Sequence, residues 1–271
     1  MKSRIAVGAA ALVLGGALAA KAQEKIVVDG STTVGPIAKS FAEFYMKNHP
    51  SVNITVGESG SGNGAKSLLN GTCDIATMSR AMKPEERDAG AAKGIQVAEH
   101  VIAMDGIAVV VHPGNPVKGL TKQQVKEVYM GEIQNWKDVG GPDLKIVVIG
   151  RDTNSGTYES FQTLVMKSDN VTDRAEVCGS NGQIRQRVMT TPGAIGYVGL
   201  AFLENVKPLE VDGVLPTPET IKTKQYPVSR PLFMYTNGEP PSGTPKAEYL
   251  GLYKTDDGKK IINEQGFVAL D

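Results

Sequence analysis

The sequence is poor in cysteine, histidine and aromatic residues, and it has no excess of charge of either sign. Among 271 residues there are two cysteines and three histidines, and His49, His100 and His112 do not have the spacing of metal ligands. We therefore predict no metal centre and no cofactor. Basic and acidic residues are equal in number, 29 each, which excludes the strong positive field typical of nucleic-acid-binding proteins.

Long apolar runs are also lacking, except at the N-terminus. Lys2 and Arg4 precede an apolar run at residues 5–19, and residues 20–22 (Ala-Lys-Ala) match a small-x-small cleavage site. This order is typical of a secretory signal peptide. The run is too short and too rich in Gly and Ala to favour the alternative, a membrane anchor. We predict that residues 1–22 are removed and that the mature chain is a soluble periplasmic protein with a net charge of −3, since three basic residues are lost.

The two cysteines are Cys73 and Cys178. Export from the cytoplasm permits a disulfide between them, and such a bond would restrain the movement of two lobes if each lobe held one cysteine. The alternative is that both are small buried residues.

The rest of the sequence alternates short β-branched runs with helical patterns, and its 31 glycines suit many tight turns. Alternation of this kind predicts an α/β protein with mainly parallel strands. Strands are predicted at residues 26–28, 52–56, 74–77, 97–103, 107–111, 145–149, 194–198 and 232–235. Helices are predicted at residues 36–48, 63–69, 84–92, 121–129, 156–166 and 181–190, with two more after residue 245.

Four segments place hydroxyl side chains at the carboxyl end of a predicted strand, and three of them also contain glycine. They are residues 29–36 (DGSTTVGP), 58–66 (ESGSGNGAK), 74–80 (DIATMSR) and 150–157 (GRDTNSGT). The N-terminus of a helix offers free amide groups and a positive dipole to an anion. Open α/β sheets bind ligands at the carboxyl ends of their strands. Four such turns in an exported protein therefore indicate a single anion-binding site.

Each of the first three segments also has an ordinary structural interpretation. Residues 29–36 could simply cap a helix, and residues 58–66 could form a flexible glycine turn. Arg80 could be a surface residue or a member of a structural ion pair. Residues 58–66 fit neither a nucleophile elbow nor a phosphate-binding P-loop, so the sequence does not indicate a hydrolase or an NTPase.

The fourth segment is the most specific. Arg151 offers a planar pair of donors for an oxyanion. Ser155 and Thr157 can donate hydroxyl protons, and Gly156 has an unobstructed amide. The alternative is that Asp152 pairs with Arg151 as a structural bridge.

In this order and spacing the four segments resemble the phosphate-binding proteins of bacterial phosphate ABC importers. Further matches are residues 105–113 (DGIAVVVHP), 133–136 (IQNW), 180–182 (SNG) and 192–198 (PGAIGYV), so that the resemblance covers roughly residues 25–236. It implies a type II periplasmic-binding-protein fold, with two α/β lobes, two hinge strands and closure around the ligand. It also implies phosphate contacts from Thr32, Thr33, Ser61, Ser79, Arg151, Ser155, Gly156 and Thr157.

One position departs from the family pattern. Some relatives carry an Asp where this chain has Ser79, and that Asp accepts the proton of the bound phosphate. Arg80 and Asp105 are therefore candidates for a rearranged site, and we take Asp105 as the hypothetical acceptor that favours phosphate over sulfate. The alternative is that Asp105 caps a turn or pairs with Arg80 or Arg151.

The predicted lobe one comprises residues 23–107 and 203–271, and lobe two comprises residues 108–202. The chain would cross near residues 105–109 and return near residues 200–205. The predicted function is non-catalytic: a monomer captures phosphate, and closure couples binding to docking on a membrane permease.

Three alternatives stay open. The ligand could be another oxyanion, such as sulfate, molybdate or arsenate. The protein could be a hydrolase with Ser61 or Ser155 as the nucleophile, although no His is placed to act as its base. The same fold could also serve an extracellular adhesion or scavenging role.

Overall fold

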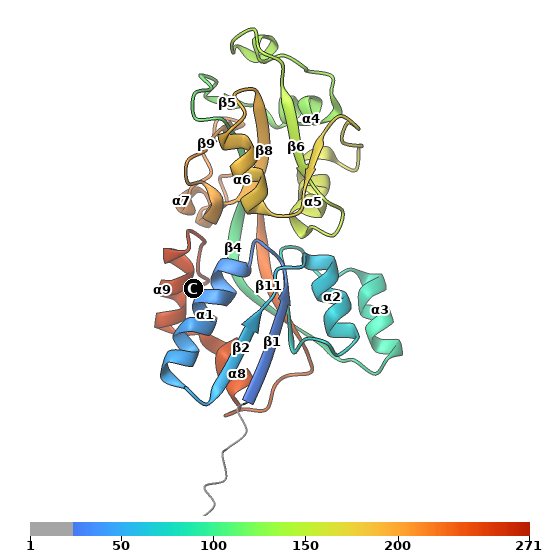
Figure 1. Ribbon diagram of the computed structural model, residues 1–271, viewed down its shortest axis with the longest axis vertical. Coiled ribbons are helices and arrows are strands. Elements are labelled where there is room, and N and C mark those ends of the chain that lie inside the picture. The colour runs from blue at the N-terminus through green and yellow to red at the C-terminus, as the bar shows by residue number, and fades with distance from the viewer. Residues whose placement is uncertain (1–23) are drawn as a thin grey trace, which may run out of the picture.

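The computed structural model describes residues 24–271, which form two α/β lobes stacked along the long axis of the molecule (Figure 1). The predicted signal peptide lies outside the described residues. Across residues 24–271, none of the helices has both the length and the apolar character needed to span a bilayer.

Lobe one contains the first and last parts of the described chain. Its strands are β1 (Glu24–Gly30), β2 (Val52–Val56) and β3 (Ile75–Met78), and its helices are α1 (Gly35–Asn48), α2 (Ser61–Leu69), α3 (Pro84–Ala92), α8 (Pro245–Gly251) and α9 (Asp256–Glu264). The predicted helices and strands of this lobe are all present, with ends shifted by a few residues.

Lobe two contains the middle of the chain. Its strands are β5 (Gly119–Leu120), β6 (Val147–Arg151), β7 (Glu176–Cys178), β8 (Ala194–Gly199), β9 (Lys207–Pro208) and β10 (Glu210–Val211). Its α-helices are α4 (Lys122–Met130), α5 (Gly156–Phe161), α6 (Asn181–Met189) and α7 (Pro218–Lys222). The helix predicted at residues 156–166 is α5 followed by a π-helical turn, Gln162–Met166.

Two long strands, β4 (Val97–Val111) and β11 (Ser229–Asn237), join the lobes (Figure 1). β4 pairs with β11 as far as Gly106, and from Ile107 onward it pairs with β8 of lobe two. This change of partner falls within the interval predicted for the first crossing, residues 105–109. The strands predicted at 97–103 and 107–111 are therefore one strand, and its last residues form an unbroken apolar run because both faces are buried.

The second crossing differs from the prediction. Residues 206–228 belong to lobe two, because β9 pairs with the end of β4 and β10 pairs with β5. Leu209, Ile221 and Tyr226 share a buried core with Val109 and Trp136. The chain therefore returns to lobe one at the start of β11, not at residues 200–205. Strands of two residues among proline-rich turns carry no periodic signal, which explains the misplaced boundary.

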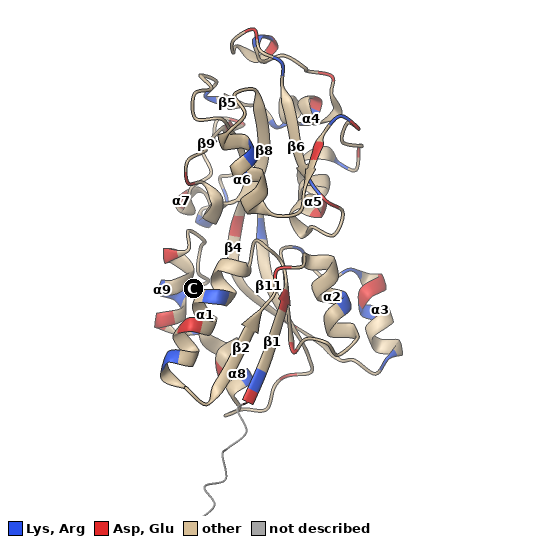
Figure 2. Cartoon of the chain, viewed as in Figure 1, with Lys and Arg blue, Asp and Glu red and all other residues tan. Residues whose placement is uncertain are grey.

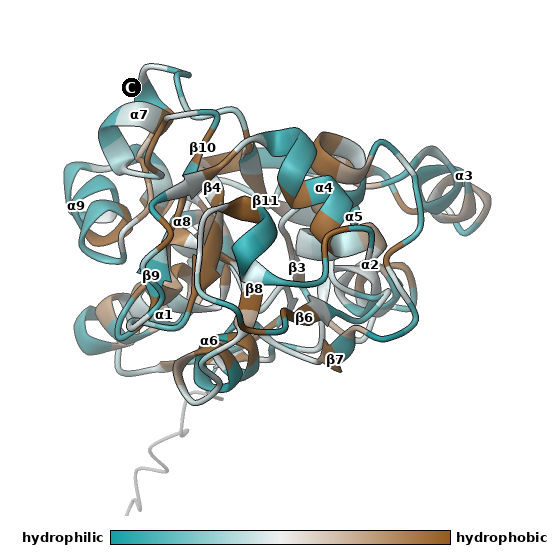
Figure 3. Cartoon of the chain, turned by 90° about the horizontal axis from the view of Figure 1, so that it is seen from above, coloured by the Kyte–Doolittle hydropathy of each residue, from teal (hydrophilic) through white to brown (hydrophobic). Residues whose placement is uncertain are grey.

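The core of lobe two explains two of the sequence matches. Trp136 is fully buried and donates a hydrogen bond from Nε1 to the carbonyl oxygen of Gly193 at 3.0 Å. Tyr197 stacks on Phe161 with ring centroids 4.1 Å apart. Residues 133–136 and 192–198 thus stabilise the fold. Seen from above, apolar strands occupy the centre and hydrophilic helix surfaces surround them (Figure 3).

The two cysteines are not bonded to each other. Cys73 is buried in lobe one, and Cys178 is half-buried at the end of β7 in lobe two. The structure therefore agrees with the alternative of small, mostly buried residues, and no disulfide restrains the lobes.

Candidate anion-binding site

The four hydroxyl-rich segments meet where the lobes face each other. Ser79 follows β3, and its amide donates to the Oγ of Ser61 at 3.1 Å, while the two Oγ atoms are 3.3 Å apart. Across the junction, the Oγ1 atoms of Thr33 and Thr157 are 2.9 Å apart. The carboxyl ends of β1, β3 and β6 therefore place hydroxyl groups from both lobes in one cluster.

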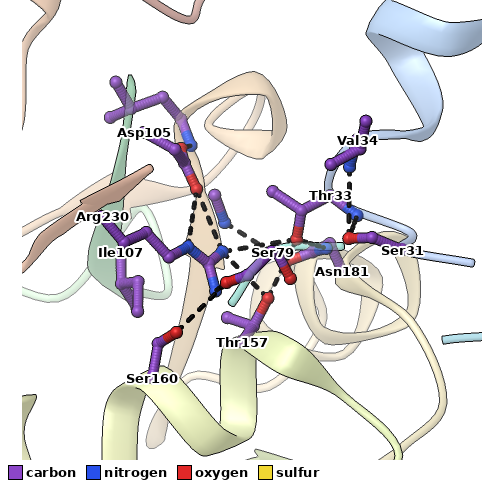
Figure 4. Close-up of polar contacts among 12 residues, drawn as sticks. Ser31, Thr33, Val34, Ser79, Asp105, Ile107, Thr157, Ser160, Asn181 and Arg230 are labelled. Atoms are coloured by element: carbon purple, nitrogen blue, oxygen red, sulfur yellow. Dashed lines mark hydrogen bonds and ion pairs between the residues drawn. The ribbon is translucent and has the colours of Figure 1, made fainter. Parts of the chain in front are cut away.

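In the turn after β1, one serine binds the backbone amides, and two threonines remain available for other contacts. Ser31 Oγ accepts from the amides of Thr33 and Val34, at 3.1 and 3.3 Å, and so stabilises the entry to α1. The side chains of Thr32 and Thr33 are then available to lobe two, where Nδ2 of Asn181 donates to both, at 3.0 and 2.9 Å (Figure 4). The helix-capping interpretation of this segment thus applies to Ser31, and the threonines face the site.

Arg151 is the clearest candidate for an anion ligand. Its side chain is 1% exposed. Nε and Nη2 donate to the carbonyl oxygens of Cys178 and Gly179, at 3.1 and 3.0 Å. Nη1 is buried, and no group among residues 24–271 accepts a hydrogen bond from it. A buried charged donor without an acceptor is costly, so this nitrogen indicates a ligand.

The charges around Arg151 agree with this interpretation. Burial lowers the pKa of Arg151, the carboxylate of Asp152 opposes that shift, and a second guanidinium, Arg230, adds to it. Asp152 is only a distant partner, with Oδ2 3.6 Å from Nη2 of Arg151. The structural bridge considered for this pair therefore involves Nη2 and leaves Nη1 without a partner.

Arg230 was not predicted from the sequence. It lies opposite Asp105 in the antiparallel pairing of β11 with β4, and Figure 2 shows basic and acidic segments side by side there, between the lobes. Nε and Nη2 of Arg230 are 3.2 and 3.0 Å from Oδ2 of Asp105. Nη1 donates to the carbonyl oxygen of Ser79 at 3.0 Å, and Nη2 also donates to Oγ1 of Thr157 at 2.9 Å (Figure 4).

The carboxylate of Asp105 is therefore bound by protein groups, whereas our hypothesis made it the acceptor of a phosphate proton. Besides Arg230, it accepts the amide of Leu200 on Oδ1 at 3.0 Å. Complete burial raises the pKa of Asp105 and lowers that of Arg230, while their mutual attraction opposes both shifts. These contacts correspond to the alternative of an arginine pair, with Arg230 in place of Arg80 or Arg151, and not to a free acceptor for a phosphate proton.

Arg80 also has partners that remove it from the ligand set. Its guanidinium binds both carboxylate oxygens of Glu86 at 2.7 Å, and Nε lies 3.0 Å from Oε2 of Glu159. These are the contacts of a structural ion pair, because each nitrogen of the guanidinium lies within 3.0 Å of a carboxylate oxygen. Glu159 belongs to α5 of lobe two and also binds Lys83 at 2.7 Å, so the cluster links the lobes beside the hydroxyl groups.

We expect Glu159→Gln to weaken anion binding by about two- to fivefold, since a partly exposed ion pair contributes up to about 1 kcal/mol. The effect should come from a faster dissociation rate, because the lost contacts exist only when the lobes touch. Glu176→Gln is the matched control, since Glu176 pairs with Arg187 inside lobe two. Stopped-flow release measurements check this, and equal rates in wild type and Glu159→Gln would show that the interlobe ion pairs do not hold the cleft shut.

The remaining predicted residues lie at the start of α5. Ser155 Oγ accepts the amide of Tyr158 at 3.2 Å, which leaves its hydroxyl proton for another acceptor. Gly156 and Thr157 open the helix, where amides lack partners within the helix. The hydrogen bonds of Ser61 and Ser155 are to serine and backbone groups. Within the described chain neither side chain is hydrogen-bonded to a His or a carboxylate, so the hydrolase alternative gains no support.

Two site residues were missed, and each left a weak signal in the sequence. Asn181 falls in the matched segment at residues 180–182, but its amide could not be assigned a partner from spacing alone. Arg230 is the second residue of β11 and precedes its apolar part, and a lone charge at the start of a buried strand implies a buried counter-charge. Neither signal identifies the partner, because Thr33 and Asp105 lie more than a hundred residues away in sequence from the groups that bind them.

The comparisons with known proteins point to one family. Residues 15–251 match the model of the PBP superfamily domain. The phosphate-binding protein PstS of Borreliella burgdorferi is 34% identical over 262 residues, which cover 91% of each chain. PstS of Bacillus subtilis is 32% identical over 253 residues, which cover 92% of this chain and 82% of that one.

The chain belongs to the PstS family of phosphate-binding proteins. A solved structure agrees: a putative phosphate ABC transporter substrate-binding protein from Clostridium perfringens, with bound phosphate, is 34% identical, with a TM-score of 0.85 over 92% of this chain and 100% of that chain. An ABC-type phosphate transport receptor from Vibrio cholerae is 33% identical, with a TM-score of 0.72. The fold class predicted from the sequence is confirmed, and the PstS relatives are binding proteins, as expected of a chain that is not an enzyme.

Proposed function

We propose that this chain captures inorganic phosphate between its lobes and delivers it to the membrane permease of an ABC importer. The observation that carries the proposal is the buried Nη1 of Arg151, a charged donor without an acceptor in the described chain. The known PstS relatives are phosphate-binding proteins. We further propose that the mature protein acts as a monomer in the periplasm after removal of residues 1–22.

The proposed contacts follow from the cluster. Arg151 supplies charge, and the hydroxyls of Ser61, Ser79, Ser155 and Thr157, together with the amide of Gly156, replace the water that the anion loses. Direct charge-assisted hydrogen bonds can offset the cost of dehydrating a phosphate in a closed site. Ser61 and Ser79 can accept as well as donate, so either can bind the proton of a hydrogenphosphate ion.

Equilibrium dialysis with labelled phosphate tests the proposal and its closest alternatives. The mature protein, stripped of bound anion, should show one saturable site, and unlabelled phosphate should compete strongly. Sulfate should compete much less, because it cannot donate a hydrogen bond to the serines. Equal competition by sulfate or molybdate would assign the site to another oxyanion, and no retained label would contradict binding.

Phosphate should also bring the lobes together. The contacts between Thr33 and Thr157, and between Asn181 and both threonines, cross the junction. Over residues 24–271 the backbone passes between the lobes through β4 and β11, as in a hinge. We expect small-angle X-ray scattering to give a smaller radius of gyration with phosphate than without it. An unchanged radius at saturating phosphate would indicate a rigid or already closed cleft.

A further inference from the structure

The guanidinium of Arg230 is held on the lobe-one side of the hinge. Arg230 lies on β11 opposite Asp105 of β4, in the part of β4 that still pairs with β11. Nε and Nη2 are 3.2 and 3.0 Å from Oδ2 of Asp105, and Nη1 donates to the carbonyl oxygen of Ser79, which follows β3, at 3.0 Å. Three contacts to a planar fork fix its orientation, so we expect the guanidinium to move with lobe one.

A fourth contact of the same group crosses to lobe two. Nη2 donates to Oγ1 of Thr157 at 2.9 Å (Figure 4). Nη2 has two protons, and Asp105 and Thr157 use one each, so its 3.4 Å approach to Thr33 is a secondary contact. A guanidinium only donates, so Thr157 is the acceptor here whichever way its bond with Thr33 runs.

We infer that Arg230 is a positioning residue for anion binding, which acts through Thr157 and not by contact with the anion. One lone pair and the proton of Thr157 remain for Thr33 and the anion, and the bond from Arg230 fixes where the Thr157 oxygen lies. A charged donor also polarises the hydroxyl that accepts from it, which strengthens the next hydrogen bond in the chain. This inference rests on the proposed function and refines it.

Arg230 also neutralises Asp105, and this structural role must be separated from positioning. The two side chains are 4% and 0% exposed, so Arg230→Met alone would leave an unpaired buried carboxylate and strongly destabilise the protein. The paired substitution Asp105→Asn/Arg230→Met removes both charges and leaves the net charge unchanged. The side-chain oxygen of Asn at position 105 can still accept the amide of Leu200, as Asp105 does.

The test is a double-mutant cycle in which phosphate affinity is measured by calorimetry. Asp105→Asn/Arg230→Met should bind phosphate about five- to fiftyfold more weakly than wild type, the range expected when a hydrogen bond from a charged donor is lost behind a ligand group. In a Thr157→Val background the same pair of substitutions should cost less than about twofold more, because the hydroxyl that Arg230 positions is already gone. In a Ser61→Ala background, where that hydroxyl is intact, the pair should cost the full factor.

Two further variants keep the test decisive. Arg185→Met/Glu204→Gln removes another ion pair, 3.4 Å apart in lobe two, with no change of net charge, and should bind phosphate as wild type does. If the paired variant at positions 105 and 230 does not fold, Arg230→Lys replaces it in the cycle, since it keeps a counter-charge for Asp105 but lacks the planar fork. It should lose affinity in the wild-type background and not in Thr157→Val.

Each contrary outcome has its own meaning. Wild-type affinity in the folded Asp105→Asn/Arg230→Met variant would show that Arg230 only neutralises Asp105. An undiminished loss in the Thr157→Val background would show that Arg230 acts on the anion directly or through the fold. Either result would overturn the inference and leave the proposed function standing, whereas absence of phosphate binding by wild type would overturn both.

Discussion

Arg151→Ala should weaken phosphate binding by roughly ten- to a hundredfold, because about 1.5–3 kcal/mol is lost when a charge-assisted contact disappears from a dehydrated site. The side chain of Arg151 is almost fully buried, and one of its nitrogens, Nη1, has no acceptor in the described chain. Calorimetric titration measures the change. Arg151→Lys should recover only part of the loss, because an ammonium group cannot reach both the Cys178–Gly179 carbonyls and the anion.

The control for Arg151→Ala is Arg185→Ala, which removes a partly exposed arginine from α6 of the same lobe. Its phosphate affinity should equal that of wild type, which shows that net charge alone does not set the affinity. If Arg151→Ala bound phosphate as tightly as wild type while keeping its melting temperature, the assignment of this residue to the site would be wrong.

Gly156→Ala should weaken phosphate binding by a comparable amount, through a steric clash and without any change of charge. A methyl group on Gly156 would lie 2.5 Å from the Oγ of Ser61 and 2.7 Å from the Oγ of Ser79. Those oxygens belong to lobe one and Gly156 to lobe two, so the clash arises only when the lobes meet. Overpacking a tight site costs about 1–3 kcal/mol, and displacing two proposed ligand hydroxyls adds to this, so we expect a loss of affinity of tenfold or more.

Gly156→Ala should destabilise the closed state of the two lobes and leave the phosphate-free protein unchanged. Phosphate should no longer reduce the radius of gyration of the variant fully, while its melting temperature without phosphate should match that of wild type. Gly150→Ala is the matched control, because a methyl group there would come no closer than 3.8 Å to the Oη of Tyr197. Normal affinity in Gly156→Ala would mean that the lobes do not approach this closely when phosphate is bound.

The sequence was sufficient for the fold class, and local patterns also led to the candidate site. Turns such as residues 150–157 combine a strand end, a helix start and hydroxyl side chains, and each of these leaves its own signal in the sequence. The hydroxyls of Thr33 and Thr157 were predicted from such turns, and the structure places them 2.9 Å apart.

The parts that were missed depend on pairing between distant segments. Arg80 and Arg230 are both arginines near a strand end, and local sequence does not reveal that Glu86 and Glu159 occupy the first while the second reaches the threonines. The same holds for Asp105, whose partner lies on the other hinge strand. The return crossing was misplaced for a related reason, since strands as short as β9 and β10 are defined by their partners and not by their own sequence.

The most direct test of the central claim is a crystal structure of the mature protein grown with phosphate. We predict a tetrahedral ion between the lobes, within hydrogen-bonding distance of Nη1 of Arg151 and of the hydroxyls of Ser61, Ser79 and Thr157. A phosphate ion bound elsewhere, or a phosphate-saturated structure in which Nη1 of Arg151 still has no partner, would contradict the account.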